Sequence, residues 1–290
     1  MAFGQLLTAM VTPFHENGDI HWEQVEQLTE HLIATKSDGV VVAGTTGESP
    51  TLSSEEKLQL FRRVKDIAGS RMDVIGGVGT NNTAYSADLA NEATKIGIDG
   101  LMAVTPYYNK PNQEGMYQHF QRIAAATTLP LMIYNIPGRC IVNLLPETLL
   151  RLAEISNITS VKEACGNLDQ ISHFLSSAPK DFQLFSGDDS LTLPTLSVGG
   201  HGVVSVAAHI AGEDLQQMMA DFFSGRVQRA AEAHRTLLPK MRACFMAPNP
   251  SPVKAMLEQM GITGRYTRLP LVPLTDAEIR QLEQWFTAAS

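Results

Sequence analysis

The sequence predicts a (β/α)8 barrel followed by a C-terminal helical region. Short apolar runs rich in β-branched residues alternate with longer amphipathic stretches, which is the pattern of parallel strands joined by crossover helices. The runs begin roughly every 20 to 34 residues, the length of one strand, loop and helix, and this favours a closed barrel over an open sheet. With 290 residues, 44% of them hydrophobic, one large core can be buried.

Eight strands are predicted, and signals for helix starts separate them. The strands are expected at residues 6–11, 39–43, 73–78, 100–104, 131–135, 158–164, 182–186 and 202–206. Ser53 and Glu56 form an S-x-x-E capping box that opens a helix, and Pro146 lies near the first position of another. Apolar residues at helical spacing in 214–223 and 229–241 predict helices after the last strand. We therefore expect a barrel domain with the active site at 1–224 and a helical region at 225–290.

Charge and composition exclude several classes of partner. The formal net charge is −8, so the chain lacks the concentrated basic surface that nucleic acids and anionic membranes require. No run approaches the 18 or more apolar residues of a membrane span, and the first residues lack a basic leader. We expect a mature cytoplasmic protein that acts on small molecules.

The sequence gives no sign of a metal or nucleotide cofactor. Cys140, Cys165 and Cys244 are widely spaced and form no CxxC pair, which indicates a reducing compartment and no zinc site. Asp188 and Asp189 have no histidine at ligand spacing, so we interpret them as the start of a helix. The eight histidines, including His201, share no ligand spacing, and GGVGTNN has Asn82 where a dinucleotide motif needs glycine.

Lys162 is the strongest catalytic candidate, because barrel chemistry takes place at the carboxyl ends of strands. It interrupts ITSVKEA, a strand that burial on both faces would otherwise fill with apolar residues. Burial lowers the pKa of an ammonium group, and the free amine can attack a ketone to form an imine. The alternative is a structural lysine that pairs with the neighbouring Glu163 or caps the barrel mouth in an ion pair.

Other polar groups are predicted at the same rim. Tyr134 ends the preceding strand and could carry the protons that imine chemistry moves, although it could equally be a core tyrosine. Thr45 and Thr46, followed by a glycine, suit a substrate carboxylate, although the same residues fit an ordinary βα turn. Arg139 could bind a second carboxylate, although a lone arginine at a rim is more often a surface ion-pair partner.

Together these motifs resemble the dihydrodipicolinate synthase family of pyruvate-dependent Schiff-base lyases and aldolases. The resemblance covers nearly the whole chain and rests on TAMVTPF, GTTGESPTLS, TPYYNKP, QEGMYQHF, YNIPGR, VKEACGNL, SGDDS, GGHGVVSV, PNPSPVK and RLP. It implies that Lys162 forms the Schiff base and that Tyr134, with Thr46 and Tyr108, relays protons. In this family one tyrosine of the pair Tyr107 and Tyr108 reaches a neighbouring subunit's site.

The resemblance also implies substrates and an assembly. Thr45 and Thr46 would bind the carboxylate of pyruvate, Gly187 and Val204 would line the pocket, and Arg139 would bind the carboxylate of aspartate semialdehyde. The lysine would condense with pyruvate, the enamine would attack the aldehyde, and cyclisation would give 4-hydroxy-tetrahydrodipicolinate on the route to lysine. No cofactor is implied, and a homotetramer built as a dimer of dimers is expected.

Two alternatives stay open. A sister aldolase acting on N-acetylneuraminate or a keto-deoxy sugar acid would use the same lysine and tyrosine, but it would need hydroxyl-binding groups where this chain has Arg139. A non-catalytic barrel that binds a keto acid and regulates a partner would have no need to keep Lys162, Tyr134 and Thr46 together.

The resemblance further implies weak feedback inhibition by lysine. Relatives that lysine inhibits have an effector pocket at the tight dimer interface, matching Ser49, Pro50, Ser54, Lys57, Asn81, Tyr85 and Tyr107 of this chain. Sensitive bacterial members typically carry histidines at the positions of Ser54 and Lys57 and an acid at the position of Tyr85. Here the acid is absent and Lys57 adds a cation, which would repel a cationic effector.

Overall fold

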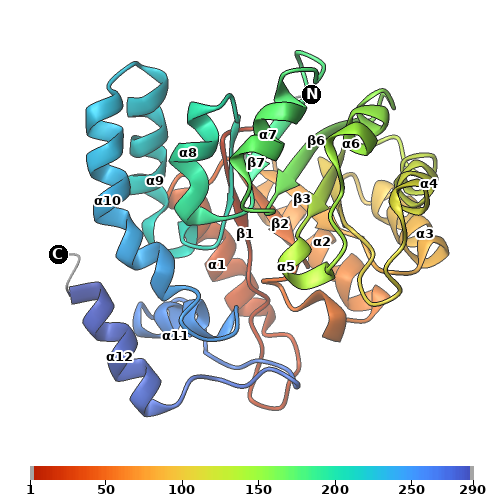
Figure 1. Ribbon diagram of the computed structural model, residues 1–290. Helices are drawn as coiled ribbons and strands as arrows, with labels where there is room; N and C mark the ends of the chain where they lie inside the picture. The colour runs from red at the N-terminus through yellow and green to blue at the C-terminus, as the bar shows by residue number, and fades with distance from the viewer. Residues whose placement is uncertain (1–2, 288–290) are drawn as a thin grey trace.

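The computed structural model describes residues 3–287, and its centre is a closed barrel of eight parallel strands (Figure 1). The strands follow one another around the barrel in chain order, and the last pairs with the first. They are β1 (Leu6–Ala9), β2 (Gly39–Val42), β3 (Asp73–Gly77), β4 (Gly100–Val104), β5 (Leu131–Asn135), β6 (Ile158–Glu163), β7 (Gln183–Ser186) and β8 (Gly202–Ser205). The predicted barrel is confirmed.

Most of the predicted strands extend one or two residues too far at their carboxyl ends. The prediction placed Ala43 in the second strand, but its backbone has a positive φ of 53°, which a strand cannot accommodate. Likewise β1 ends at Ala9 and β6 at Glu163. The apolar runs thus continue into the loops of the barrel rim, where the backbone turns and the polar groups of the site begin.

Helices cover the outside of the barrel. They are α1 (Trp22–Ala34), α2 (Ser54–Ala68), α3 (Thr83–Thr94), α4 (Gln113–Ala124), α6 (Pro146–Ala153), α7 (Leu168–Leu175), α8 (Thr192–Ser197) and α9 (Ala208–Phe223). Three short elements lie in the loops: η1 (Ser49–Thr51), α5 (Pro137–Cys140) and η2 (Asp189–Leu191). The predicted capping box is present, with Ser53 and Glu56 each accepting a hydrogen bond from the other's backbone N–H.

The predicted C-terminal helices are present as α10 (Val227–Ala243), α11 (Ser251–Gln259) and α12 (Asp276–Thr287). They lie together to one side of the barrel, drawn in blue in Figure 1, with α10 packed along α9. The expected helix at 214–223 belongs to α9, the eighth helix of the barrel. The domain boundary placed at 224/225 falls in the turn between α9 and α10, and it stays a prediction.

Buried cations are few and mark the places that matter for function. Among residues 3–287, three lysines are buried: Lys57 in α2, Lys162 in β6 and Lys254 in α11. Because burying a charge is costly, each needs a partner, a lowered pKa or a function.

No helix among residues 3–287 is long and apolar enough to cross a membrane.

Candidate active site

A cavity of about 520 Å³ opens at the carboxyl ends of strands β2 to β5. Its wall includes Thr45 from the loop after β2, Tyr107 from the loop after β4, Tyr134 from β5, and Arg139 from α5. These side chains come from the rim where the sequence predicted the site. Lys162 is not on this wall. Its amine contacts the ring of Tyr134, and Tyr134 is on the wall.

The Lys162 side chain is buried at the end of β6, where only 5% of the residue is exposed. Its Nζ lies 4.1 Å from the centroid of the Tyr134 ring. Burial lowers the pKa of the Lys162 amine to about 8, with a smaller lowering from the charge of Arg139, and the charge of Asp189 opposes both. An amine with this pKa is a far better nucleophile near neutral pH than an exposed lysine.

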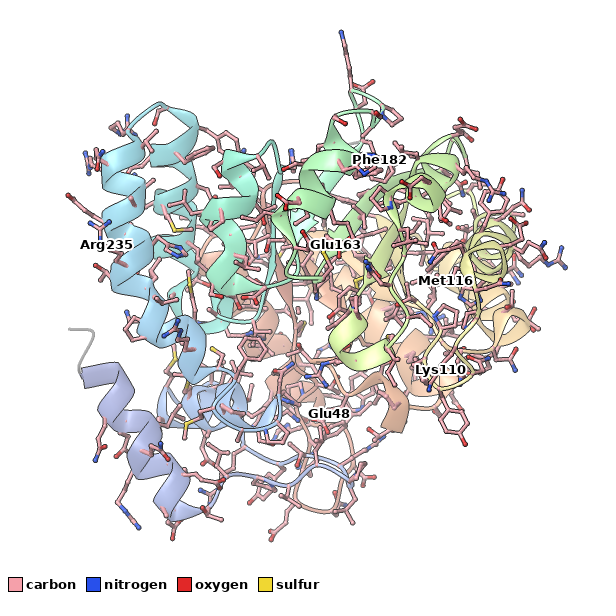
Figure 2. All side chains as sticks on the ribbon, in the orientation of Figure 1. Glu48, Lys110, Met116, Glu163, Phe182 and Arg235 are labelled. Carbon is pink, nitrogen blue, oxygen red and sulfur yellow. The ribbon has the colours of Figure 1, made fainter. Side chains whose placement is uncertain are left out.

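The structure rules out the alternative in which Lys162 pairs with Glu163. Neighbouring residues of a strand point to opposite sides, and the Glu163 carboxylate accepts hydrogen bonds from Asn135 Nδ2 at 3.0 and 3.1 Å and from the Cys165 N–H at 2.8 Å. Burial raises the pKa of Glu163. Glu163, labelled near the centre of Figure 2, thus belongs to a separate polar network.

Asp189 is a member of the site whose role the sequence did not indicate. The expected helix start is present, because Asp188 accepts from the Ser190 N–H at the beginning of η2. Asp189 itself is buried, and its carboxylate accepts from the Ser205 hydroxyl and from the backbone N–H groups of Val206 and Ala207. It is also the acid whose charge acts on Lys162. From the sequence, Asp188 and Asp189 are interpreted together as the start of a helix. Because Asp188 alone fulfils that role, the separate role of Asp189 was not predicted.

The two threonines after β2 have different partners. The Thr45 side chain is among the neighbours that lower the pKa of the Tyr134 phenol against the larger effect of burial, while the Thr46 hydroxyl accepts from Asn249 Nδ2 at 2.9 Å. From the sequence, Thr46 is assigned to the proton relay beside Tyr134, and that role stays a prediction. Burial raises the pKa of the Tyr134 phenol, so the group is a neutral hydrogen-bond donor at neutral pH.

Tyr107 and Tyr108 take different directions. Tyr107 lines the cavity of its own chain, whereas Tyr108 is 88% exposed and has a positive φ of 70°. A tyrosine this exposed makes no contribution to the cavity of its own chain. Its predicted place in a proton relay therefore requires a second subunit, and it stays a prediction.

The remaining predicted residues lie around the site. Arg139 is on the cavity wall and exposed. A Cβ at Gly187 would lie 2.8 Å from Cβ of Ala164 and 3.2 Å from Cε of Lys162, so a side chain there would clash with Ala164 and crowd the lysine stem. Val204 is buried in β8. The substrate-binding roles of these three residues stay predictions.

The predicted effector residues share the cavity with the site. Its wall includes Ser49, Pro50, Lys57, Asn81, Tyr85 and Tyr107. Ser54 is not on the wall but lies 2.7 Å from the Tyr85 hydroxyl. Lys57 is buried, and its Nζ lies 6.0 Å from the centroid of the Tyr85 ring. Burial lowers the pKa of Lys57, and no acid is among the causes of that shift.

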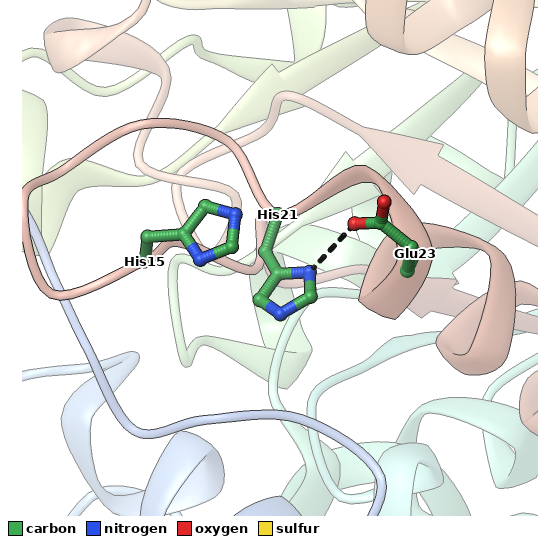
Figure 3. A group of neighbouring side chains, drawn as sticks. All are labelled: His15, His21 and Glu23. Atoms are coloured by element: carbon green, nitrogen blue, oxygen red, sulfur yellow. Dashed lines mark ion pairs between the residues drawn. The ribbon is translucent and has the colours of Figure 1, made fainter.

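Among the residues that the structure describes, one cluster of potential metal ligands lies outside the site. His15 and His21 stack with ring centroids 3.9 Å apart and planes 20° from parallel, and His21 Nδ1 lies 3.2 Å from the Glu23 carboxylate (Figure 3). The lone pairs of an imidazole lie in its plane, so face-to-face rings do not converge on one ion. His21 Nδ1 also accepts from the Gln24 N–H at the start of α1. These contacts explain the cluster without a metal.

The fold and the buried amine define the class of protein: a barrel enzyme that captures carbonyl compounds through an imine. The chain belongs to the dihydrodipicolinate synthetase family, whose model matches residues 2–289. It is 57% identical over 283 residues to the 4-hydroxy-tetrahydrodipicolinate synthase 1 of Halalkalibacterium halodurans, covering 98% of this chain and 96% of the relative.

Solved structures agree with this membership. A dihydrodipicolinate synthase from Bacillus anthracis is 46% identical, with a TM-score of 0.97 and 99% of each chain covered. A protein described as the first monomeric dihydrodipicolinate synthase variant is 40% identical, with a TM-score of 0.96 and with 99% of this chain and 97% of the other covered. The family thus includes a variant that does not assemble.

Proposed function

We propose that this protein condenses pyruvate with L-aspartate 4-semialdehyde to give 4-hydroxy-tetrahydrodipicolinate, with Lys162 as the residue that forms the Schiff base. The observation that carries the proposal is the buried Lys162 amine, with a pKa of about 8, in contact with the Tyr134 ring. Full-length membership of a family of synthases supplies the identity of the substrates. A sugar-acid aldolase or a non-catalytic barrel finds no comparable support.

The reaction begins with attack of the neutral Lys162 amine on the keto carbon of pyruvate. Water leaves the carbinolamine to give an imine, and loss of a methyl proton converts the imine to an enamine. The enamine carbon then attacks the aldehyde of the second substrate. Finally, the substrate's own amino group attacks the imine carbon, closes the ring and releases the lysine amine.

The reaction transfers protons, and we assign the role of proton carrier to Tyr134. Thr45 lies on the same cavity wall and is among the neighbours that lower the pKa of the phenol, so we assign the relay to this pair, with Tyr108 of a second subunit completing it. We assign the carboxylate of pyruvate to Thr45 and Thr46, with Gly187 and Val204 around it. Arg139, on the cavity wall, would bind the carboxylate of the semialdehyde.

We further propose a cytoplasmic homotetramer built as a dimer of dimers. The exposed Tyr108 supports an assembly, because a partner subunit would remove its large aromatic side chain from water. Sedimentation analysis would test the assembly. A monomer that retains full activity would show that Tyr108 has no part in the relay.

Incubation with pyruvate and L-aspartate 4-semialdehyde, followed by mass spectrometry of the product, tests the function. The proposal predicts the cyclic condensation product and no cleavage of N-acetylneuraminate in a parallel reaction. Cleavage of the sugar acid, without condensation, would identify the sister aldolase instead.

A further inference from the structure

The segment that follows α10 returns to the barrel rim and contacts the loop after β2. Asn249 and Thr46, which are 203 residues apart in the chain, are both buried, and the Asn249 Nδ2 donates to Thr46 Oγ1 at 2.9 Å. The C-terminal region therefore reaches a residue assigned to the substrate carboxylate.

A buried ion pair fixes the same loop two residues further on. Lys254 of α11 and Glu48 have no exposed side-chain surface, and Lys254 Nζ lies 2.5 Å from Glu48 Oε1. Each member of the pair makes a further hydrogen bond: Lys254 donates to the Tyr266 carbonyl at 2.7 Å, and Glu48 Oε2 accepts from the Arg268 N–H at 2.9 Å. Buried pairs with this degree of hydrogen bonding define a single geometry.

Arg268 and Phe14 complete the attachment. The Arg268 guanidinium donates to both carboxylate oxygens of Glu56, in α2, at 3.0 and 2.5 Å. The Phe14 ring lies 4.4 Å from Lys254 Nζ and 4.5 Å from Arg268 Cζ. The C-terminal segment thus contacts the loop that carries Thr46, the helix that follows this loop, and Phe14 in the loop after β1. Glu48, labelled in the lower half of Figure 2, lies beside the C-terminal segment that supplies Lys254.

The Asn249 amide also fixes the direction of the Thr46 proton. A hydroxyl has one proton and two lone pairs, so an oxygen that accepts from an amide keeps its proton for another acceptor. No other partner of the Thr46 hydroxyl is found in the described part of the chain. Asn249 Oδ1 is buried and has no partner within residues 3–287, so the bond to Thr46 is the one hydrogen bond of this amide in that part of the chain.

We propose that Asn249 is a positioning residue: it donates to Thr46 so that the Thr46 hydroxyl donates to the carboxylate of the bound keto acid. The Lys254–Glu48 pair holds the two residues at this distance. The proposal rests on the proposed function, because it assigns a carboxylate substrate to the loop after β2.

A double-mutant cycle tests the proposal, with the KM for pyruvate and kcat measured for Asn249→Ala, Thr46→Val and the double variant. A hydrogen bond to a charged group is worth about 1.5–3 kcal/mol, so each single variant should raise KM about tenfold or more, with kcat within about twofold of wild type. The double variant should be no worse than Thr46→Val, because Asn249 acts through that hydroxyl. Multiplying effects, or an unchanged KM in Asn249→Ala, would overturn the proposal.

Asn249→Asp gives a second test with a nearly isosteric side chain. A carboxylate accepts where the amide donated, so the Thr46 proton would turn away from the substrate. We expect a larger rise in KM than for Asn249→Ala. A smaller rise would contradict the assigned direction of the proton.

Asn157→Ala is the matched control. Asn157 Nδ2 donates to the carbonyls of Ala124 and Thr127, far from the rim, so its loss should lower the melting temperature and leave KM unchanged. Borohydride trapping of pyruvate on wild-type Lys162 separates the two claims. If no adduct forms, the proposed function fails. If the adduct forms and the Asn249 variants keep the wild-type KM, only the positioning role fails.

Discussion

Tyr134 and Lys162 are direct partners in the register of β5 and β6, and the lysine amine lies 4.1 Å from the centroid of the tyrosine ring. Contact with the ring face favours the charged amine, while burial favours the neutral amine. With a pKa of about 8, roughly a tenth of the molecules carry a free amine at pH 7, against well under a thousandth for an exposed lysine. The pairing therefore provides a nucleophile and a proton carrier in contact.

Replacing the lysine should remove the reaction and leave the fold intact. Lys162→Ala deletes the covalent nucleophile, so product formation should fall by at least about a thousandfold, to the level of the solution reaction. The melting temperature should change by no more than a few degrees, because the variant also removes a costly buried cation. Circular dichroism and product assays check both. An active Ala variant would place the imine on another residue.

The pH dependence of kcat/KM should report the pKa of Lys162 and the effect of the Asp189 charge on it. The pKa of the Lys162 amine is lowered to about 8, so kcat/KM for pyruvate should rise with pH and level off above that value. The charge of Asp189 raises this pKa, and Asp189→Asn should therefore move the rising limb to lower pH. A limb that moves to higher pH, or does not move, would exclude the coupling.

Substitutions of the two threonines should change different kinetic constants. Thr45→Val removes the partner of the Tyr134 phenol and should lower kcat by about 10²-fold, the usual contribution of a positioned proton carrier. Thr46→Val should instead raise the KM for pyruvate. Steady-state kinetics of both variants decide the matter, and a loss of kcat in Thr46→Val alone would restore the assignment that the motif suggested.

Arg139→Ala should selectively weaken binding of the second substrate. A charge-assisted hydrogen bond contributes about 1.5–3 kcal/mol when desolvated, and the exposure of Arg139 places its effect at the lower end. We expect the KM for aspartate semialdehyde to rise about tenfold while pyruvate is still trapped. The assignment fails if pyruvate trapping is lost and the affinity for the aldehyde is unchanged.

Lysine should inhibit this enzyme poorly. The cavity presents the buried cation of Lys57 and the phenol of Tyr85, so a cationic effector meets repulsion where an acid would attract it. Initial rates at saturating pyruvate should show half-inhibition above about 1 mM lysine, the equivalent of roughly −4 kcal/mol of binding. Lys57→Gln, which removes the repulsion, should become more sensitive. Half-inhibition of wild type below that concentration would contradict the expectation.

Local patterns account for most of the fold. The eight apolar runs predicted the eight strands, because strands buried on both faces must be apolar, and the rim residues Lys162 and Tyr134 stood out as exceptions. The exact strand ends were missed, since an apolar residue such as Ala43 is equally acceptable in a buried loop.

Long-range partners could not be predicted. The contacts of Thr46 with Asn249 and of Glu48 with Lys254 join residues more than 200 positions apart, and no local spacing encodes them. Asp189 was interpreted as part of a helix start because its neighbour Asp188 caps the helix. Which of Thr45 and Thr46 faces Tyr134 depends on how one loop turns, and two adjacent threonines in a sequence do not reveal this.

Reductive trapping tests the central claim most directly. Wild-type protein is treated with borohydride in the presence of pyruvate, digested, and mapped by mass spectrometry. A reduced pyruvate adduct on Lys162, prevented by Lys162→Ala, is the predicted result. An adduct on another lysine, or none at all under conditions where the enzyme turns over, would contradict the account.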